Sequence, residues 1–212
     1  MIKQFTFNHF EVNTYVIVDE TTKQCAIVDP ACEASFEDAQ LTQYIEQKGL
    51  QVTHILLTHA HVDHIAGLRQ ACKAYALPVT MHAEGRKLLK QAEVYGSVMG
   101  FAVDNMSDLE VVEINDNDLL HIGGTEVECR YVPGHCPGSM CFVLPADKSV
   151  ITGDALFHFS IGRTDLPGGD YPTLIDYLKS RILTLPDDYR VLPGHGIASQ
   201  IGKEKRYNSF LV

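Results

Sequence analysis

The segment of this sequence with the clearest chemistry is 58–64, which reads T-H-A-H-V-D-H. Histidine is the commonest metal ligand among side chains. An apolar strand is predicted to end just before His59, so His59 and His61, two residues apart on extended chain, point the same way. The chain then turns into a helix, which brings Asp63 and His64 to the same space. We therefore predict a metal site at the carboxyl end of this strand, the edge where ligands bind in α/β folds.

Three more metal-capable side chains follow predicted strands, each directly after a glycine. They are His135 in V-P-G-H, Asp154 in I-T-G-D and His195 in V-L-P-G-H. A glycine at this point lets the backbone turn tightly as the strand ends. A single histidine after a strand is usually an ordinary loop residue. Four strand ends that all present histidine or aspartate instead indicate one shared metal centre.

The secondary structure needed to position these residues alternates between strands and helices. β-Branched and aromatic clusters predict strands at 5–7, 14–18, 25–28, 54–58, 78–81, 111–114, 127–132, 140–144, 149–152 and 190–192. Apolar periodicity predicts helices at 36–48, 63–75, 174–185 and 201–208, with a helix and then a loop within 83–106 and a glycine-rich loop at 158–170. Both halves follow the plan of strands, helix and strand. This predicts an α/β fold of two mixed sheets packed face to face, with helices outside, in a single domain spanning 1–212.

Composition excludes several classes of protein. Of 212 residues, 45% are hydrophobic and 21% charged, which excludes wholesale disorder. The net charge of −10 disfavours a nucleic-acid partner. No stretch approaches the ~18 apolar residues that span a bilayer, and the start, M-I-K-Q-F-T-F, is too alternating for a signal peptide. We expect a cytoplasmic protein without a membrane partner, whose six cysteines are reduced.

Three segments carry a resemblance to a known family. They are residues 58–64, the loop S-I-G-R-T-D-L-P-G-G-D at 160–170, and G-H-G at 194–196 followed by I-G-K-E-K at 201–205. They resemble the metallo-β-lactamase fold superfamily, and within it the small glyoxalase II-type (hydroxyacylglutathione hydrolase-like) metallohydrolases. The resemblance implies an αββα sandwich with the metal site at the sheet edge.

The resemblance also implies a division of the ligands between two divalent metal ions. His59, His61 and His135 would bind the first metal, Asp63, His64 and His195 the second, and Asp154 would bridge them. Asp63 and Asp154 are thereby the candidate catalytic residues. Histidine and carboxylate ligands accept zinc, iron and manganese; we expect zinc.

Such a site predicts a hydrolase of a small thioester, S-lactoylglutathione or a related acyl thioester. Two metals can share a hydroxide whose parent water has its pKa lowered toward ~7. That hydroxide attacks the carbonyl carbon while a metal stabilises the oxyanion. The chain ends 17 residues after His195, so the extra C-terminal helical domain that helps some glyoxalase II enzymes bind glutathione is expected to be absent. The thiol carrier therefore stays open.

The main alternative comes from a different class of enzyme, a mononuclear non-haem iron dioxygenase acting on persulfides. The superfamily includes such enzymes, and iron accepts a His/His/Asp facial set. The full complement of seven ligands, including His64 and His195, favours two metals and hydrolysis. A β-lactamase role is disfavoured because no export signal is expected.

Two residues beside the ligands have expected supporting roles. Asp29 ends an apolar strand before a proline, where it could hydrogen-bond the metal-binding turn. Cys136 directly follows His135, and we interpret it as a small buried side chain rather than a ligand.

Three basic residues are candidates for substrate binding. Arg163 could bind a substrate carboxylate with its planar fork, or it could pair with Asp165 and hold the loop, which we favour. Lys203 and Lys205 belong to a small basic cluster that is either a solvated helix face or a site for an anionic substrate.

Overall fold

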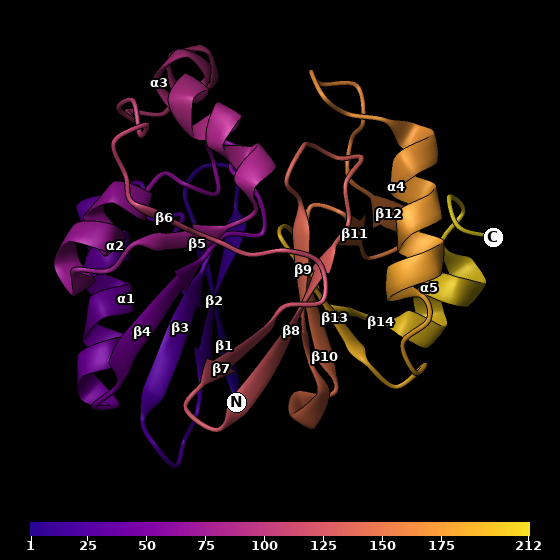
Figure 1. The fold of residues 1–212 in the computed structure, drawn as a ribbon, viewed down its shortest axis with the longest axis horizontal. Coiled ribbons are helices and arrows are strands. Elements are labelled where there is room, and N and C mark those ends of the chain that lie inside the picture. Colours follow the sequence, from indigo (N-terminus) through magenta and orange to yellow (C-terminus); the bar gives the residue numbers. More distant parts are fainter.

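The chain forms two six-stranded sheets packed face to face in the computed structural model, which describes residues 1–212 (Figure 1). The first sheet runs in the order β1 (Ile2–Phe7), β2 (Val12–Val18), β3 (Gln24–Val28), β4 (Gln51–Leu56), β5 (Val79–Met81), β6 (Val111–Glu113). The second runs β14 (Ser199–Gln200), β13 (Arg190–Pro193), β10 (Ser149–Gly153), β9 (Met140–Leu144), β8 (Thr125–Tyr131), β7 (Leu119–Ile122). Both sheets contain parallel and antiparallel pairs. The predicted fold class is confirmed.

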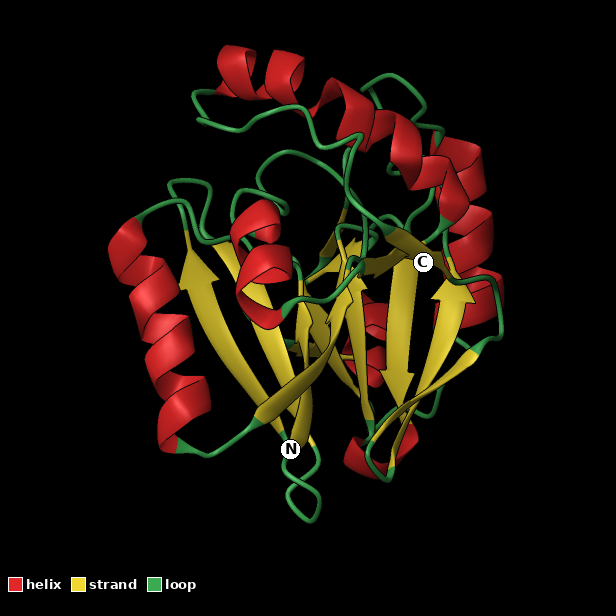
Figure 2. Cartoon of the chain, turned by 60° about the vertical axis from the view of Figure 1, so that its left-hand side comes forward, coloured by secondary structure: helices red, strands yellow, loops and turns green.

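Helices cover the outer faces of both sheets, and α3 (Arg86–Met99) lies across the top of the sandwich, above the strand ends (Figures 1 and 2). The other helices are α1 (Ser35–Gln47), α2 (Leu68–Tyr75), α4 (Tyr171–Tyr177), which continues as a π-helical turn at Leu178–Ile182, and α5 (Ile201–Tyr207). A short hairpin, β11 (Leu156–Phe157) and β12 (Ser160–Ile161), interrupts the predicted glycine-rich loop. No helix in the chain is both long and apolar enough to cross a membrane.

The core between the sheets takes fully buried side chains from both of them. Tyr15 and Leu56 of the first sheet pack with Phe142, Ile151 and Leu192 of the second. Strands β2, β9 and β10 are buried along their whole length, which is why they appear in the sequence as nearly continuous apolar runs. Burial of these apolar side chains between the sheets supplies hydrophobic free energy that stabilises the sandwich and the loops at its edge.

The helix predicted at 63–75 begins only at Leu68, which corrects that boundary. Tertiary contacts hold the preceding segment in a turn. The Asn8 side-chain amide donates to the carbonyl of Asp63 (2.9 Å). The Gly67 amide donates to the carbonyl of Pro30 (2.9 Å), and a Cβ on Gly67 would lie 2.8 Å from the Cys32 carbonyl oxygen. These contacts involve residues more than 30 positions away, so local periodicity carried no sign of them.

Candidate metal centre

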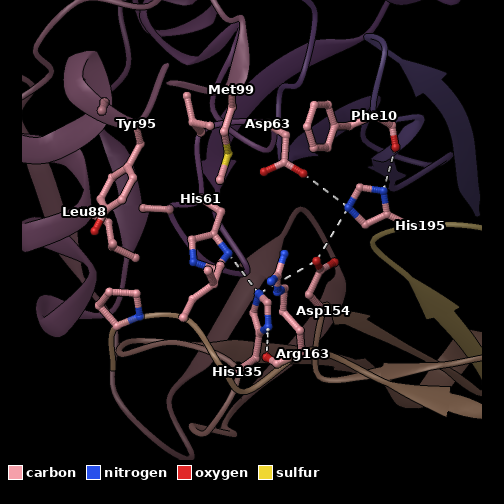
Figure 3. A pocket seen from close by; sticks show the side chains of 15 residues that line it. Phe10, His61, Asp63, Leu88, Tyr95, Met99, His135, Asp154, Arg163 and His195 are labelled. Carbon is pink, nitrogen blue, oxygen red and sulfur yellow. Dashed lines mark hydrogen bonds and ion pairs between the residues drawn. The ribbon is translucent and has the colours of Figure 1, made fainter. Parts of the chain in front are cut away.

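The seven predicted ligands meet at one edge of the sandwich because of strand direction. Strands β8, β10 and β13 run parallel to one another in the second sheet. Their carboxyl ends lead into His135, Asp154 and His195, while residues 59–64 follow β4 of the first sheet. The structure thus brings together all the side chains that sequence analysis singled out as ligands (Figure 3 shows five of them).

His59, His61 and His135 form one group of three, which we call the first triad. Their ligand atoms all lie within 4.8 Å of one another, and His135 Nε2 is 2.9 Å from His61 Nδ1. His59 Nε2 is buried and has no hydrogen-bond partner. A buried polar atom without a partner costs free energy, and a cation between the three rings would remove that cost. This arrangement fits a metal ion.

Asp63, His64 and His195 form the second triad. His195 Nε2 lies 3.3 Å from Asp63 Oδ2 and 3.3 Å from His64 Nε2. The His64 side chain is fully buried, and that of Asp63 is 11% exposed. Two histidine nitrogens and a carboxylate oxygen converging in a buried space are a suitable ligand set for a divalent metal.

Asp154 lies between the two triads, as a bridging ligand must. Its Oδ2 is 3.8 Å from His135 Nε2 of the first triad and 3.5 Å from His195 Nε2 of the second. Its Oδ1 is 3.3 Å from His64 Nε2 but has no hydrogen-bond partner of good geometry. The cluster of histidines and aspartates therefore fits a dinuclear metal site. Its ligands do not select between zinc, iron and manganese.

The two triads differ in protonation when no metal is bound. Burial and the neighbouring imidazoles lower the pKa of His59 and His135, and lower that of His61 to about 4. Burial also acts to lower the pKa of His195, but Asp154 and Asp63 outweigh it and raise the value to about 9. The same carboxylates hold the pKa of His64 well above its usual range. At pH 7 the first triad is therefore neutral and the second holds protons.

This difference predicts unequal proton release on metal binding. A metal entering the first triad should release almost no protons at pH 7, whereas one entering the second should release at least about one. As pH falls from about 9, affinity should decrease at the second triad, while the first triad, whose histidines have lowered pKa values, should keep its affinity below pH 7. Calorimetric titration of the metal-free protein with metal, in buffers of different ionisation enthalpy, measures the number of protons released at each triad. Equal release at the two sites would contradict the assigned protonation states.

Groups behind the ligands orient them, as expected for Asp29. Its Oδ2 accepts from His64 Nδ1 (2.9 Å) and from the hydroxyl of Thr58 (2.6 Å), and its Oδ1 accepts from the Thr58 amide (2.7 Å). The Thr58 oxygen in turn lies 3.1 Å from His59 Nδ1. One buried carboxylate thus holds a ligand of each triad with Nε2 facing the site. The prediction that Asp29 hydrogen-bonds the metal-binding turn is confirmed.

Two backbone carbonyls orient the remaining loop histidines. His195 Nδ1 donates to the carbonyl of Phe10 (2.9 Å), and His135 Nδ1 donates to that of Arg163 (2.8 Å) (Figure 3). Neither partner could be predicted from the sequence, because a main-chain carbonyl is present at every residue. No side-chain type marks it.

The glycines before the ligands do not all act by the predicted mechanism. Gly134 and Gly153 have positive φ angles of 114° and 48°, so there glycine permits the tight turn. Gly194 is not in the left-handed region, and the prediction is wrong for it. A Cβ at Gly194 would lie 2.2 Å from Asp154 Oδ1 and 2.7 Å from His64 Cε1. Glycine is needed there for space.

Cys136 is buried beside the first triad. Burial raises the pKa of its thiol to about 12, and its Sγ lies 3.3 Å from the hydroxyl of Ser139. Its Sγ also lies within 4.8 Å of the ligand atoms of the first triad, so the interpretation of Cys136 as a space-filling side chain rather than a ligand stays a prediction.

A cavity of about 220 Å³ opens beside the ligands (Figure 3). Arg163 lines this cavity, but its guanidinium donates two hydrogen bonds of 2.8 Å to the Asp165 carboxylate. This pairing is the role for Arg163 that we favoured from the sequence. Neither Lys203 nor Lys205 lines the cavity. The Lys205 ammonium instead donates to Asp187 (2.7 Å), because α5 packs on the outer face of the second sheet through Ile201. Of the three predicted substrate-binding residues, only Arg163 is at the cavity.

Comparison with known proteins places this centre in a wide family. The model described as Metallo-beta-lactamase superfamily matches residues 8–195. The "Probable metallo-hydrolase YqgX" of Bacillus subtilis is 36% identical over 95% of this chain and 92% of its own length. The "Hydroxyacylglutathione hydrolase GloC" of Haemophilus influenzae is 36% identical over 95% of this chain and 93% of its own length.

Solved structures show the same architecture. The B3 metallo-beta-lactamase BLEG-1 is 31% identical with a TM-score of 0.90, over 100% of both chains. TTHA1623 in a di-iron-bound form is 34% identical with a TM-score of 0.87, over 99% of this chain and 100% of the other. ETHE1 from Myxococcus xanthus is 27% identical with a TM-score of 0.80, over 100% of this chain and 84% of the other.

Proposed function

This chain belongs to the metallo-beta-lactamase superfamily, and we propose that it is a glyoxalase II-like hydrolase of small acyl thioesters such as S-lactoylglutathione. The observation that carries the proposal is the position of Asp154 between the three histidines of the first triad and the two histidines and aspartate of the second. We further propose zinc as the metal. The similarity to a hydroxyacylglutathione hydrolase supports the thioester substrate, and a di-iron relative supports iron as the second choice of metal.

The residues that line the cavity support hydrolysis by water. They include no serine, cysteine or lysine that could act as a protein nucleophile. When bound, two divalent ions lower the pKa of water toward ~7 and stabilise the negative charge that develops on a carbonyl oxygen. The chain's own part is to present Asp63 and Asp154 as carboxylates ready to bind metal. In the metal-free protein, His64 and His195 hold the pKa of Asp63 below, and that of Asp154 well below, the usual range although both carboxylates are buried.

A persulfide dioxygenase with one iron is the second candidate function. The similarity to ETHE1 over the whole of this chain supports it. The first triad with Asp154 could hold a single iron and leave positions open. In that case the second triad, with its buried histidine and carboxylate, would have no metal to bind, and for this reason we favour hydrolysis.

Oxygen dependence separates the two functions. Protein purified without added metal would be analysed for metal content and then assayed with S-lactoylglutathione and with glutathione persulfide, each with and without oxygen. A hydrolase should cleave the thioester at the same rate in both atmospheres, with a rate that rises as pH passes through ~7. Oxygen-dependent persulfide turnover without thioester cleavage would overturn the proposed hydrolase in favour of the dioxygenase.

A further inference from the structure

One wall of the cavity is an apolar face of α3. Leu88, Ala92, Tyr95 and Met99 line the cavity and recur at positions i, i+4, i+7 and i+11, the spacing of a single helix face. The neighbouring Val98 does not line the cavity and is 78% exposed. Figure 3 shows Leu88 and Tyr95 on the side of the cavity away from His195 and Asp154, with Met99 between them and Asp63.

Further apolar side chains complete this wall. Ala60 and Val62 lie between the ligands of the metal-binding turn, while Phe10 and Leu166 come from the loops on either side. We call these four residues and the α3 face the apolar wall.

Aromatic contacts hold the Met99 end of α3 against the β1–β2 turn. The Phe10 ring lies 5.2 Å from that of Phe101, just beyond the helix, and the His9 ring stacks on Phe101 at 4.4 Å. His9 Nε2 also lies 3.4 Å from the Met99 carbonyl. Phe10 also accepts a hydrogen bond from His195 through its main-chain carbonyl. The same residue therefore contacts both the apolar wall and the second triad. The wall is thus organised before any ligand binds, which lowers the cost of binding.

Outside the set of predicted metal ligands, no side chain that lines the cavity carries an unpaired positive charge. Arg163 is its only arginine or lysine, and Asp165 occupies its guanidinium. Glutathione carries two carboxylates and an ammonium group, and a cavity of about 220 Å³ with an apolar wall provides no partners for them. Burying unpaired charged groups there would be costly. The polar carrier must therefore extend through the mouth, and the acyl group is the part that fits inside.

From this geometry we infer that the enzyme selects thioesters whose acyl group is an apolar chain of several carbons, in preference to a short hydroxylated group such as lactoyl. The inference rests on the proposed function and names its substrate class. A hydroxyl placed against Leu88, Ala92 or Met99 of the apolar wall would lose its hydrogen bonds to water without replacement, whereas each methylene buried there gains affinity.

A series of thioesters tests this selectivity. Acetyl, lactoyl, butanoyl and hexanoyl thioesters would be made with glutathione and with the uncharged carrier N-acetylcysteamine. We expect kcat/KM to rise by at least about tenfold from acetyl to hexanoyl with either carrier, and lactoyl to fall below butanoyl.

Matched variants of α3 assign the effect to the apolar wall. Met99→Gln, which keeps the length of the side chain, should lower the hexanoyl-to-acetyl ratio of kcat/KM by about tenfold. Val98→Gln, at the adjacent exposed position, should leave the ratio unchanged. Calorimetry supplies a readout other than activity: a hexanoyl ketone with a methylene in place of the thioester sulfur should bind the Met99→Gln protein about tenfold more weakly. Circular dichroism melts check that both variants fold.

The possible failures are distinguishable. Thioester cleavage without dependence on chain length, or an unchanged ratio in Met99→Gln, would overturn this inference and leave the proposed function standing. A preference for lactoyl over butanoyl would do the same. Absence of cleavage of every thioester by the metal-loaded protein would overturn the proposed function and the inference together.

Discussion

Replacing Asp154 by alanine should remove bound metal from both triads and lower thioester hydrolysis by about 10³-fold or more. The carboxylate lies within 3.8 Å of His135 Nε2, and closer still to the same atom of His64 and of His195. Removal also takes away the charge that raises the pKa of His64 and His195, so the variant should bind fewer protons as well as less metal at pH 7.

Metal analysis and steady-state kinetics on the same preparation measure this loss. Asp188→Ala is the matched control, because Asp188 is an exposed aspartate whose ion pair with Lys148 (2.6 Å) lies on the surface. That variant should keep both metals and its turnover. His59→Ala should also abolish activity but empty mainly the first triad. If Asp154→Ala retains two metals and near-normal turnover, the dinuclear assignment is wrong.

Two glycines that flank His195 should respond very differently to alanine. At Gly194 a Cβ would meet Asp154 Oδ1 at 2.2 Å and His64 Cε1 at 2.7 Å, so the bridging carboxylate and a buried ligand must both move. At Gly196 a Cβ would meet nothing within 4 Å, although φ is +73°. We expect Gly194→Ala to lower kcat/KM by about 100-fold or more, because a displacement of ~1 Å in a catalytic group has effects of that size. Gly196→Ala should cost only about 1 kcal/mol in the free energy of unfolding.

Denaturant unfolding and kinetics of the two variants, each with and without metal, separate the two effects. Overpacking at Gly194 should cost about 1–3 kcal/mol in the free energy of unfolding in addition to the loss of activity. Gly196→Ala should retain its metals and turn over within about threefold of wild type, since its cost is conformational. Similar losses of activity in both variants would contradict the steric explanation for Gly194.

The fold class and the ligand set could be predicted because both depend on local signals. Buried strands such as β9 and β10 appear as apolar runs, and each of the predicted ligand segments directly follows a strand. Four strand ends that present histidine or aspartate indicated one shared centre, and the parallel directions of β8, β10 and β13 in the structure bring His135, Asp154 and His195 to the same edge. Asp29 could be assigned a supporting role on the same grounds.

Other features could not be predicted because they depend on contacts between distant residues. The helix predicted from Asp63 starts at Leu68 because Asn8 and Pro30 hold the intervening turn. Lys205 is directed toward Asp187 by the packing of α5 rather than by its own sequence context.

The sequence by itself determined that histidines and aspartates would gather at one sheet edge, since strand direction and residue type suffice for that conclusion. Only the tertiary structure decided what surrounds them. The carbonyl of Phe10 orients His195 across 185 positions of chain, and α3 places Met99 in the lining of the same cavity as ligands from both sheets. The reason is physical: a ligand's type is a property of one residue, whereas the shape and polarity of a cavity arise from side chains that only packing brings together.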